Sequence, residues 1–225
     1  MLPKVERKYT KINVYGKSYD IRPYRTKEEK EYLIAKEINP ETSLIDYILK
    51  PCVKQNIENL SQIEEVLLLI EIRKISIGNE FEIEFECEKC GNMSFGNISL
   101  SDTVSYEKGK YKDIEIDGVK LYIKENNTKS VKKRLNEADT TTEQEFISLI
   151  ASIYKIEVDG KVYDDFTFKE MCDWFDEQDV TFTKKVIELF SQMSPKLKLE
   201  YDVPCLTCGE NYSSIITGTD DFFFT

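Results

Sequence analysis

Two copies of a short cysteine motif constrain the fold of this chain more than any other feature. CEKCG contains Cys87 and Cys90, and CLTCG contains Cys205 and Cys208. Each motif lies between segments in which apolar and polar residues alternate, which predicts a strand on either side of a tight knuckle. The two-residue spacing lets both sulfurs of a knuckle face one ion, and the glycine that follows permits a turn with positive φ.

Together the four cysteines form the ligand set of a structural zinc site. Four thiolates close the tetrahedral shell of Zn²⁺ and leave no position for a reacting water, so we do not expect catalytic zinc. Zinc ribbons separate their knuckles by roughly 15–20 residues, whereas residues 91–204 separate these two, which predicts a large insertion. Redox-active pairs and disulfides stay as alternatives, although a redox CxxC is expected at the start of a helix.

The other residues that carry chemistry form no recognisable catalytic pattern. The sequence has no histidine, which excludes Ser-His-Asp and Cys-His catalysis and histidine-ligated metals. Cys52 and Cys172 lack a partner motif and are expected to be small buried residues. Pairs such as Asp164–Asp165 and Asp220–Asp221 are expected on the solvated surface. We therefore predict no catalytic residues and no enzyme, with a carboxylate-based enzyme as the minor alternative.

The charge balance argues against a nucleic-acid partner. The chain has 42 acidic and 31 basic residues, for a net charge of −11, and a field of this sign repels phosphates. The basic run from Lys129 to Arg134 is expected to be a solvated face. No apolar run reaches the roughly 20 residues of a membrane helix, and the first residues lack a secretory pattern. We expect no membrane association and folding in a reducing cytoplasm.

The alternation of helical and strand patterns predicts an α+β fold with two lobes. Residues 1–79 read as an N-terminal helical lobe with a short hairpin. Residues 80–225 read as an antiparallel zinc-ribbon-like lobe with knuckles at 87–91 and 205–209. A large α+β segment, residues 101–195, is predicted to be inserted between the two knuckles.

Local signals predict where several elements begin and turn. Thr26 is the predicted N-cap of the first helix, with Glu29 closing its capping box. Pro51 is predicted to end the second helix, and a later helix is predicted over about 182–193. Three turns are predicted at Gly16-Lys17, Asp117-Gly118 and Asp159-Gly160.

An aromatic run near the C-terminal end is the one segment with an unusual surface chemistry. Phe222, Phe223 and Phe224 would form a costly apolar patch if they were exposed. Two alternatives follow: the segment folds back onto the core, or it docks into a partner. Our hypothesis is that it is an interaction element.

Several segments form a pattern through their order and spacing. They are Leu2-Pro3-Lys4, Ile21-Arg22-Pro23-Tyr24, Thr26–Lys30, Leu33–Ala35, Ile63–Leu69, Ile72–Lys74 and Ile77-Gly78. Taken together, these segments resemble the T-even-type phage baseplate hub assembly proteins. The resemblance covers most of residues 1–100 and about the last 20, whereas residues 101–195 are not matched segment by segment. Tyr24 stands where the family tends to have Phe.

This resemblance implies a component, or an assembly chaperone, of the baseplate hub of a contractile phage tail or phage-tail-like particle. The implied partners are other baseplate or hub proteins, with no small-molecule substrate, in the host cytoplasm during assembly and in the tail baseplate. The zinc prediction rests on the cysteines of this sequence alone. The alternative is a zinc-ribbon nucleic-acid-binding or transcription-related phage protein, which the acidic or neutral flanks FEIEFE and KLKLEYD disfavour.

Overall fold

The computed structural model describes residues 8–40, 42–126, 131, 134, 141–215 and 223. These residues form several small sheets and seven α-helices, so the predicted mixed α+β class is confirmed. The contacts divide the chain into two compact units. Unit 1 comprises the described parts of Met1–Ile57, Ile63–Tyr106 and Leu197–Thr225, and unit 2 comprises those of Glu58–Gln62 and Glu107–Lys196. The predicted lobe boundary at residues 79 and 80 stays a prediction.

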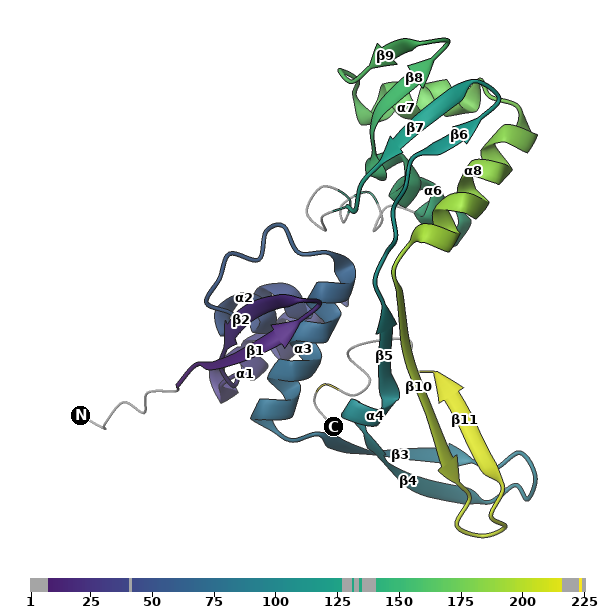
Figure 1. Ribbon diagram of the computed structural model, residues 1–225. Coiled ribbons are helices and arrows are strands. Elements are labelled where there is room, and N and C mark those ends of the chain that lie inside the picture. Colours follow the sequence, from purple (N-terminus) through teal and green to yellow (C-terminus); the bar gives the residue numbers. More distant parts are fainter. Residues whose placement is uncertain are drawn as a thin grey trace. The chain divides into compact units, whose positions relative to one another are not determined.

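The first part of unit 1 is a hairpin followed by helices (Figure 1). Ile21, at the end of the hairpin, forms an isolated antiparallel bridge with Val53, which ties the hairpin to the helical segment. In chain order the elements are β1 (Thr10–Val14), β2 (Lys17–Ile21), α1 (Thr26–Ile38), the π-helix η1 (Ile45–Leu49), α2 (Lys50–Cys52) and α3 (Gln62–Ser76).

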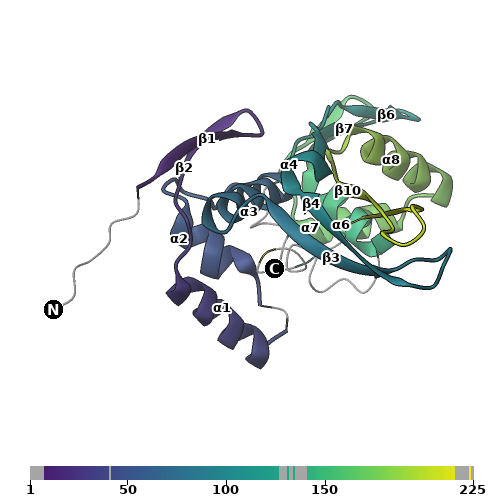
Figure 2. The same cartoon turned by 90° about the horizontal axis from the view of Figure 1, so that it is seen from below.

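The second part of unit 1 contains two antiparallel hairpins whose knuckle ends lie side by side in both ribbon views (Figures 1 and 2). One hairpin pairs all seven residues of each strand, from Glu80 with Ser99 to Glu86 with Met93. The other belongs to a three-stranded sheet with the order β11-β10-β5. The elements are β3 (Glu80–Glu86), β4 (Met93–Ser99), α4 (Leu100–Thr103), β5 (Val104–Glu107), β10 (Lys196–Pro204) and β11 (Asn211–Ile215).

Unit 2 is a four-stranded antiparallel sheet with three helices gathered on one face (Figures 1 and 2). It has its own core, in which Leu121, Leu149 and Val186 are fully buried. The strand order is β6-β7-β8-β9. The elements are β6 (Ile114–Ile116), β7 (Val119–Ile123), α6 (Thr141–Ser152), β8 (Ile153–Val158), β9 (Lys161–Tyr163), α7 (Phe168–Asp176) and α8 (Val180–Met193).

Two of the three predicted hairpin turns are confirmed, and the third is shifted by one residue. Asp117-Gly118 and Asp159-Gly160 both have positive φ at each residue, as a two-residue type I′ turn requires. The first hairpin turns at Tyr15-Gly16, with φ of 53° and 81°, rather than at Gly16-Lys17. Tyr15 is buried, and its ring packs 5.8 Å from that of Tyr106, which favours the register that places it in the turn.

The predicted start of α1 and the predicted role of Pro51 were wrong. The N-cap is Arg25, and Glu28 rather than Glu29 accepts the reciprocal hydrogen bond, 2.8 Å from the Arg25 backbone nitrogen. Glu28 is preferred because it also binds the guanidinium of Arg22, at 2.5 and 3.1 Å. Pro51 lies in the first turn of α2. The N–H groups of a helix's first residues have no partner within the helix, so the missing N–H of Pro51 costs no hydrogen bond.

The helix α3 is the most buried of the described helices, as its apolar sequence predicts. Leu68 and Ile72 are fully buried, and three charged residues, Glu64, Glu65 and Arg73, are buried with them. Glu64 accepts from the Tyr19 hydroxyl at 2.9 Å and faces the Lys17 ammonium at 2.7 Å. Arg73 donates to the carbonyl oxygens of Gly78 and Glu80, so its charge joins the end of α3 to the start of β3.

The Arg22–Glu28 pair generates a pH-dependent prediction. Burial opposes ionisation of Glu28, but the hydrogen bonds from Arg22 and from the Arg25 backbone outweigh it and lower the Glu28 pKa. A lowered folded-state pKa contributes stability above the unfolded pKa of about 4.3 and loses it as the pH falls further. We expect Glu28→Gln to lower the free energy of unfolding by about 3 kcal/mol at pH 7, because it leaves a buried guanidinium unpaired.

Urea unfolding at pH 7 and at successively lower pH values tests this expectation. The difference between wild type and Glu28→Gln should shrink below about pH 4.3. Glu31→Gln is the control, because Glu31 forms only an exposed pair with Lys27 at 3.6 Å and should cost about 0.5 kcal/mol or less. A Glu28→Gln effect that is the same at every pH would contradict the assignment.

Candidate metal centre

The structure brings the four predicted cysteines together in one cluster. The sulfurs of Cys87, Cys90, Cys205 and Cys208 all lie within 4.8 Å of one another. Across the two knuckles, Cys87 lies 3.6 Å from Cys208 and Cys90 lies 3.8 Å from Cys205. A tetrahedral zinc with Zn–S distances of about 2.3 Å separates its sulfurs by roughly 3.8 Å. A disulfide would need about 2.05 Å, so the cysteines are unbonded thiols with a spacing compatible with zinc.

The two knuckles repeat one backbone arrangement. In the first, the Gly91 N–H donates to the Cys87 carbonyl at 2.8 Å, and the Cys87 N–H donates to Asn92 at 3.0 Å. In the second, the Gly209 N–H donates to the Cys205 carbonyl at 2.9 Å. The glycines have φ of 69° and 72°, a conformation that other residues adopt only with strain. The glycine of each CxxCG motif is therefore needed for the turn that aims the sulfurs.

The backbone of the second knuckle favours a thiolate. Backbone N–H groups of Cys208 and Thr207 donate to the Cys205 sulfur and lower its pKa to about 6. The Glu210 N–H lowers the pKa of Cys208, but desolvation and hydrogen bonds to the other three sulfurs raise it to about 12. Four thiols this close cannot all ionise unless a cation offsets the repulsion between the resulting thiolates. The cluster thus has the donor set and the electrostatic need that a thiophilic divalent cation satisfies.

Apolar and polar contacts between the two hairpins hold the knuckles in place. The rings of Phe85 and Tyr212 stack with centroids 4.4 Å apart and an interplanar angle of 13°. The buried hydroxyl of Ser94 accepts from the Leu206 N–H at 2.9 Å, which joins the first hairpin to the second knuckle. At the rim, Lys89 pairs with Glu210 at 2.6 Å.

The two hairpins approach each other closely at a glycine. A Cβ added to Gly96 on β4 would lie 2.7 Å from Cγ1 of Val203 on β10. Val203 is buried in the core cluster that also contains Cys87 and Cys205. The hairpins therefore pack closely only because position 96 has no side chain.

Burial places the cluster at the edge of this core. Cys87 and Cys205 are 4% and 2% exposed, whereas Cys90 is half-buried and Cys208 is exposed. The sulfurs face one another, so an ion held by all four would have its shell filled by the protein. Such an arrangement supports structure and leaves no site for a substrate.

Comparison with known proteins identifies the family to which the chain belongs. A family model described as T4 bacteriophage base plate protein matches residues 3–224. The chain belongs to this baseplate family. No curated protein and no solved structure matches the chain.

One of the three tail residues of this baseplate protein lies among the described residues. Phe223 is fully buried, and its ring lies 5.6 Å from that of the buried Tyr24. This is the placement expected from the alternative in which the segment folds back. Phe222 and Phe224 lie outside the described residues, and the partner-binding role of the three phenylalanines stays a prediction.

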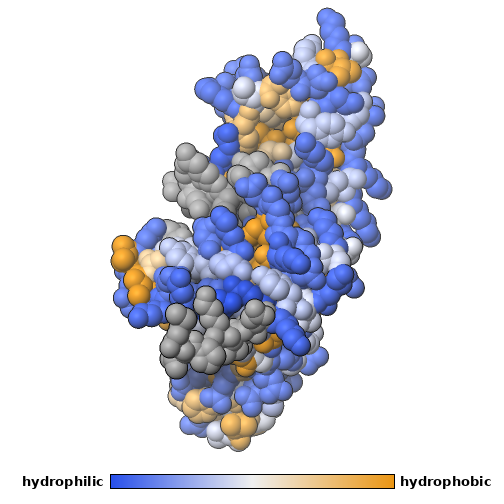
Figure 3. Space-filling model, turned by 90° about the vertical axis from the view of Figure 1, so that its left-hand side faces the viewer, coloured by the Kyte–Doolittle hydropathy of each residue, from blue (hydrophilic) through white to orange (hydrophobic). Residues whose placement is uncertain are grey.

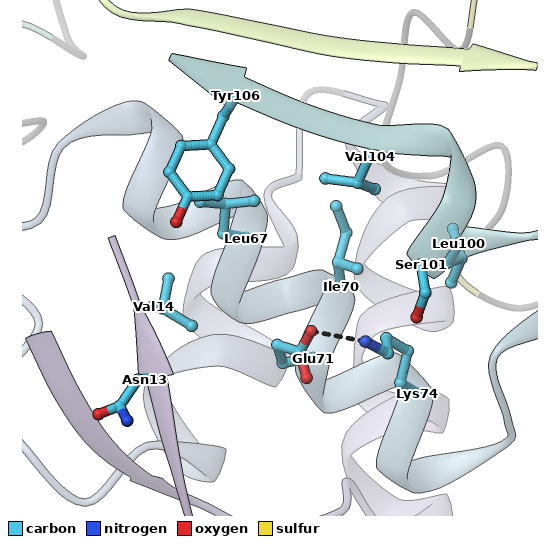
Figure 4. A pocket seen from close by; sticks show the side chains of 10 residues that line it. All are labelled: Asn13, Val14, Leu67, Ile70, Glu71, Lys74, Leu100, Ser101, Val104 and Tyr106. Carbon is cyan, nitrogen blue, oxygen red and sulfur yellow. Dashed lines mark hydrogen bonds and ion pairs between the residues drawn. The ribbon is translucent and has the colours of Figure 1, made fainter. Parts of the chain in front are cut away.

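A small pocket in unit 1 was not predicted from the sequence (Figure 4). Its volume is about 190 Å³, and its walls come from β1, α3, α4 and β5. Figure 4 shows Val14, Ile70 and Tyr106 around it, with Glu71 and Lys74 joined by an ion pair of 2.8 Å. Because the two charges at its wall neutralise each other, the pocket offers little to a charged ligand. Among the described residues, no helix has the length and apolar character needed to cross a membrane.

The Gly96–Val203 contact predicts a non-additive pair of variants. Gly96→Ala should lower the free energy of unfolding by about 1–3 kcal/mol, because the new methyl group overpacks the hairpin interface. Val203→Ala should also destabilise, through a cavity. The double variant should be more stable than the sum of the two losses implies, since each change relieves the other. Urea unfolding of the four proteins measures the coupling, and strict additivity would contradict the contact.

Proposed function

We propose that this chain is a non-enzymatic component or assembly chaperone of the baseplate hub of a contractile phage tail or phage-tail-like particle. The observation that carries the proposal is the family match over residues 3–224. The hub role is supported by the N-terminal segments that resemble hub assembly proteins. On this proposal the chain works by binding other baseplate or hub proteins, in the host cytoplasm during assembly and at the tail.

The proposal includes a structural zinc ion held by Cys87, Cys90, Cys205 and Cys208. The spacing of the sulfurs and the lowered pKa of the Cys205 thiol support it. When bound, the ion supplies positive charge that stabilises four thiolates and cross-links the two hairpins. The ion would thus join the two ends of residues 91–204, the segment that contains Glu107–Lys196 of unit 2. The ribbon-like description of the lobe and the absence of catalytic residues are parts of the same proposal.

The first prediction from this proposal concerns metal content and stability. The protein purified under reducing conditions should contain about one zinc per chain by elemental analysis. Cys205→Ser should lose most of this zinc and unfold at a lower temperature, because three thiolates hold the ion less tightly. Cys172→Ser is the matched control, since Cys172 is a partly buried residue of unit 2 that packs against its core, outside the cysteine cluster.

The controls decide between zinc and the alternatives. Cys172→Ser should keep its zinc, and a chelator should shift the melting of wild type but not of Cys205→Ser. A stable wild-type protein with no metal and freely titrating thiols would refute the zinc site. In that case the two CxxC pairs would need a redox explanation.

The second prediction concerns the aromatic tail. Deletion of residues 220–225 should leave a folded protein that no longer co-purifies with other baseplate proteins of the same particle. A control with Asp220→Asn and Asp221→Asn keeps the phenylalanines and should still assemble. An unfolded deletion product would assign the tail to the core, as the buried Phe223 would allow. A salt-dependent shift on DNA at physiological salt would favour the nucleic-acid alternative over the hub proposal.

A further inference from the structure

Unit 2 contains an apolar groove that the metal centre and the tail do not explain. Its volume is about 430 Å³. On the face shown in Figure 3, unit 2 forms the upper part and carries a patch of apolar side chains within a polar surround. We call the site the β9 groove. Its apolar and aromatic lining comes from Ile156, Val158, Tyr163, Phe166, Met171 and Trp174.

The groove borders an open strand edge. In the order β6-β7-β8-β9, β9 is an edge strand of this sheet, and its three residues are exposed. Ile156 pairs with Tyr163 and Val158 with Lys161, so the lining residues of both strands share one face of the sheet. A further strand added beside β9 would direct every second side chain over that same face.

The register also shows which backbone groups are available for such pairing. The two-residue turn Asp159-Gly160 makes Val158 and Lys161 a hydrogen-bonded pair. The next pair, Glu157 with Val162, is then of the non-hydrogen-bonded kind. The N–H and C=O of Val162 therefore point away from β8, toward the open edge.

The segment that follows β9 and supplies one wall of the β9 groove is acidic, and we call its carboxylates the acidic rim. Lys161 of β9, on the lining face of the sheet, is the cation nearest to this segment along the strand. Residues 164–179 contain seven acidic side chains and a single lysine, and all seven are exposed. The lysine, Lys169, is paired with Asp173 at 2.8 Å. Glu170 lines the groove itself, and hydrogen bonds from the backbone and hydroxyl of Thr167 lower its pKa, so it is ionised at neutral pH. A ligand that covers the groove must offset this negative charge.

We propose that the β9 groove binds an extended segment of a partner protein in which large apolar side chains alternate with lysine or arginine. The segment would pair with the edge of β9, place its apolar side chains against Trp174 and Phe166, and set its cations against the acidic rim. A second copy of this chain is disfavoured because its net charge is −11. Anionic surfaces are repelled for the same reason. This inference goes beyond the proposed hub role, since it concerns unit 2 and requires neither zinc nor the tail.

Trp174 is the only tryptophan of the chain and lines the β9 groove, so its fluorescence reports on binding there. The probes are short synthetic peptides without aromatic residues, titrated into the full-length protein. One alternates leucine with lysine, one replaces every lysine by glutamate, and one replaces every leucine by serine. We expect saturable changes in Trp174 emission with the first peptide alone, and at least about tenfold weaker binding when salt is raised to 1 M.

Variants distinguish a specific groove from general charge attraction. Asp164→Lys with Asp165→Lys should weaken binding at least about tenfold. The matched control, Glu82→Lys with Glu84→Lys, makes the same charge change on the exposed face of β3 and should keep the affinity. Val162→Pro removes an outward N–H while sparing the β8–β9 ladder, so it should weaken binding with little change in melting temperature.

The outcomes either support or overturn the proposal. Equal binding of the lysine and glutamate peptides, or equal loss in the two double variants, would overturn it. Concentration-dependent self-association that changes Trp174 emission would identify a second copy as the occupant instead. Because the assay uses neither metal content nor co-purification with tail proteins, its failure leaves the hub proposal standing.

Discussion

The close packing of the two knuckle hairpins is the contact on which the rest of unit 1 depends. Gly96 admits the side chain of Val203, and Phe85 stacks on Tyr212, so the strands before and after the inserted unit are held against each other. The same core reaches α3 through Ile70. A chain that loses this contact loses the geometry that aims four sulfurs at one point.

This contact closes a very long loop, and the physics of loop closure explains why the chain tolerates it. The entropic cost of closing a loop rises only with the logarithm of its length, so an insertion of residues 91–204 adds little beyond a short one. Unit 2 also has its own buried core around Leu121, Leu149 and Val186, which contributes its own stability. The constraint at the knuckles therefore needs to fix only the two ends of the inserted segment.

Local signals predicted part of the structure, and most contacts between distant segments were not predicted. The positive-φ glycines of the CxxCG motifs and the two Asp-Gly turns depend on a few neighbouring residues, and their backbone geometry is confirmed. The start of α8 was set two residues too late, because Asp179 caps the helix through the N–H groups of Thr181 and Phe182. The pairing of β5 with β10 and the preference for Glu28 over Glu29 depend on partners far along the chain or on Arg22, which no local pattern contains. The cysteine cluster was predictable because two matching CxxCG motifs together supply the ligand set of one ion. Its position at the edge of the hairpin core was not predictable from the motifs.

The chemistry of the cluster then limits where binding by this baseplate protein can occur. Because the sulfurs face one another, the hub proposal assigns partner recognition to other parts of the chain, the aromatic tail and the surfaces of the two units. In unit 2 all three residues of the edge strand β9 are exposed, and edge strands in soluble proteins are commonly protected by charge. The acidic rim provides that protection against like-charged chains and leaves the edge open to a cationic one. The same charges that keep unit 2 from pairing with itself thus select the kind of segment that can pair with it.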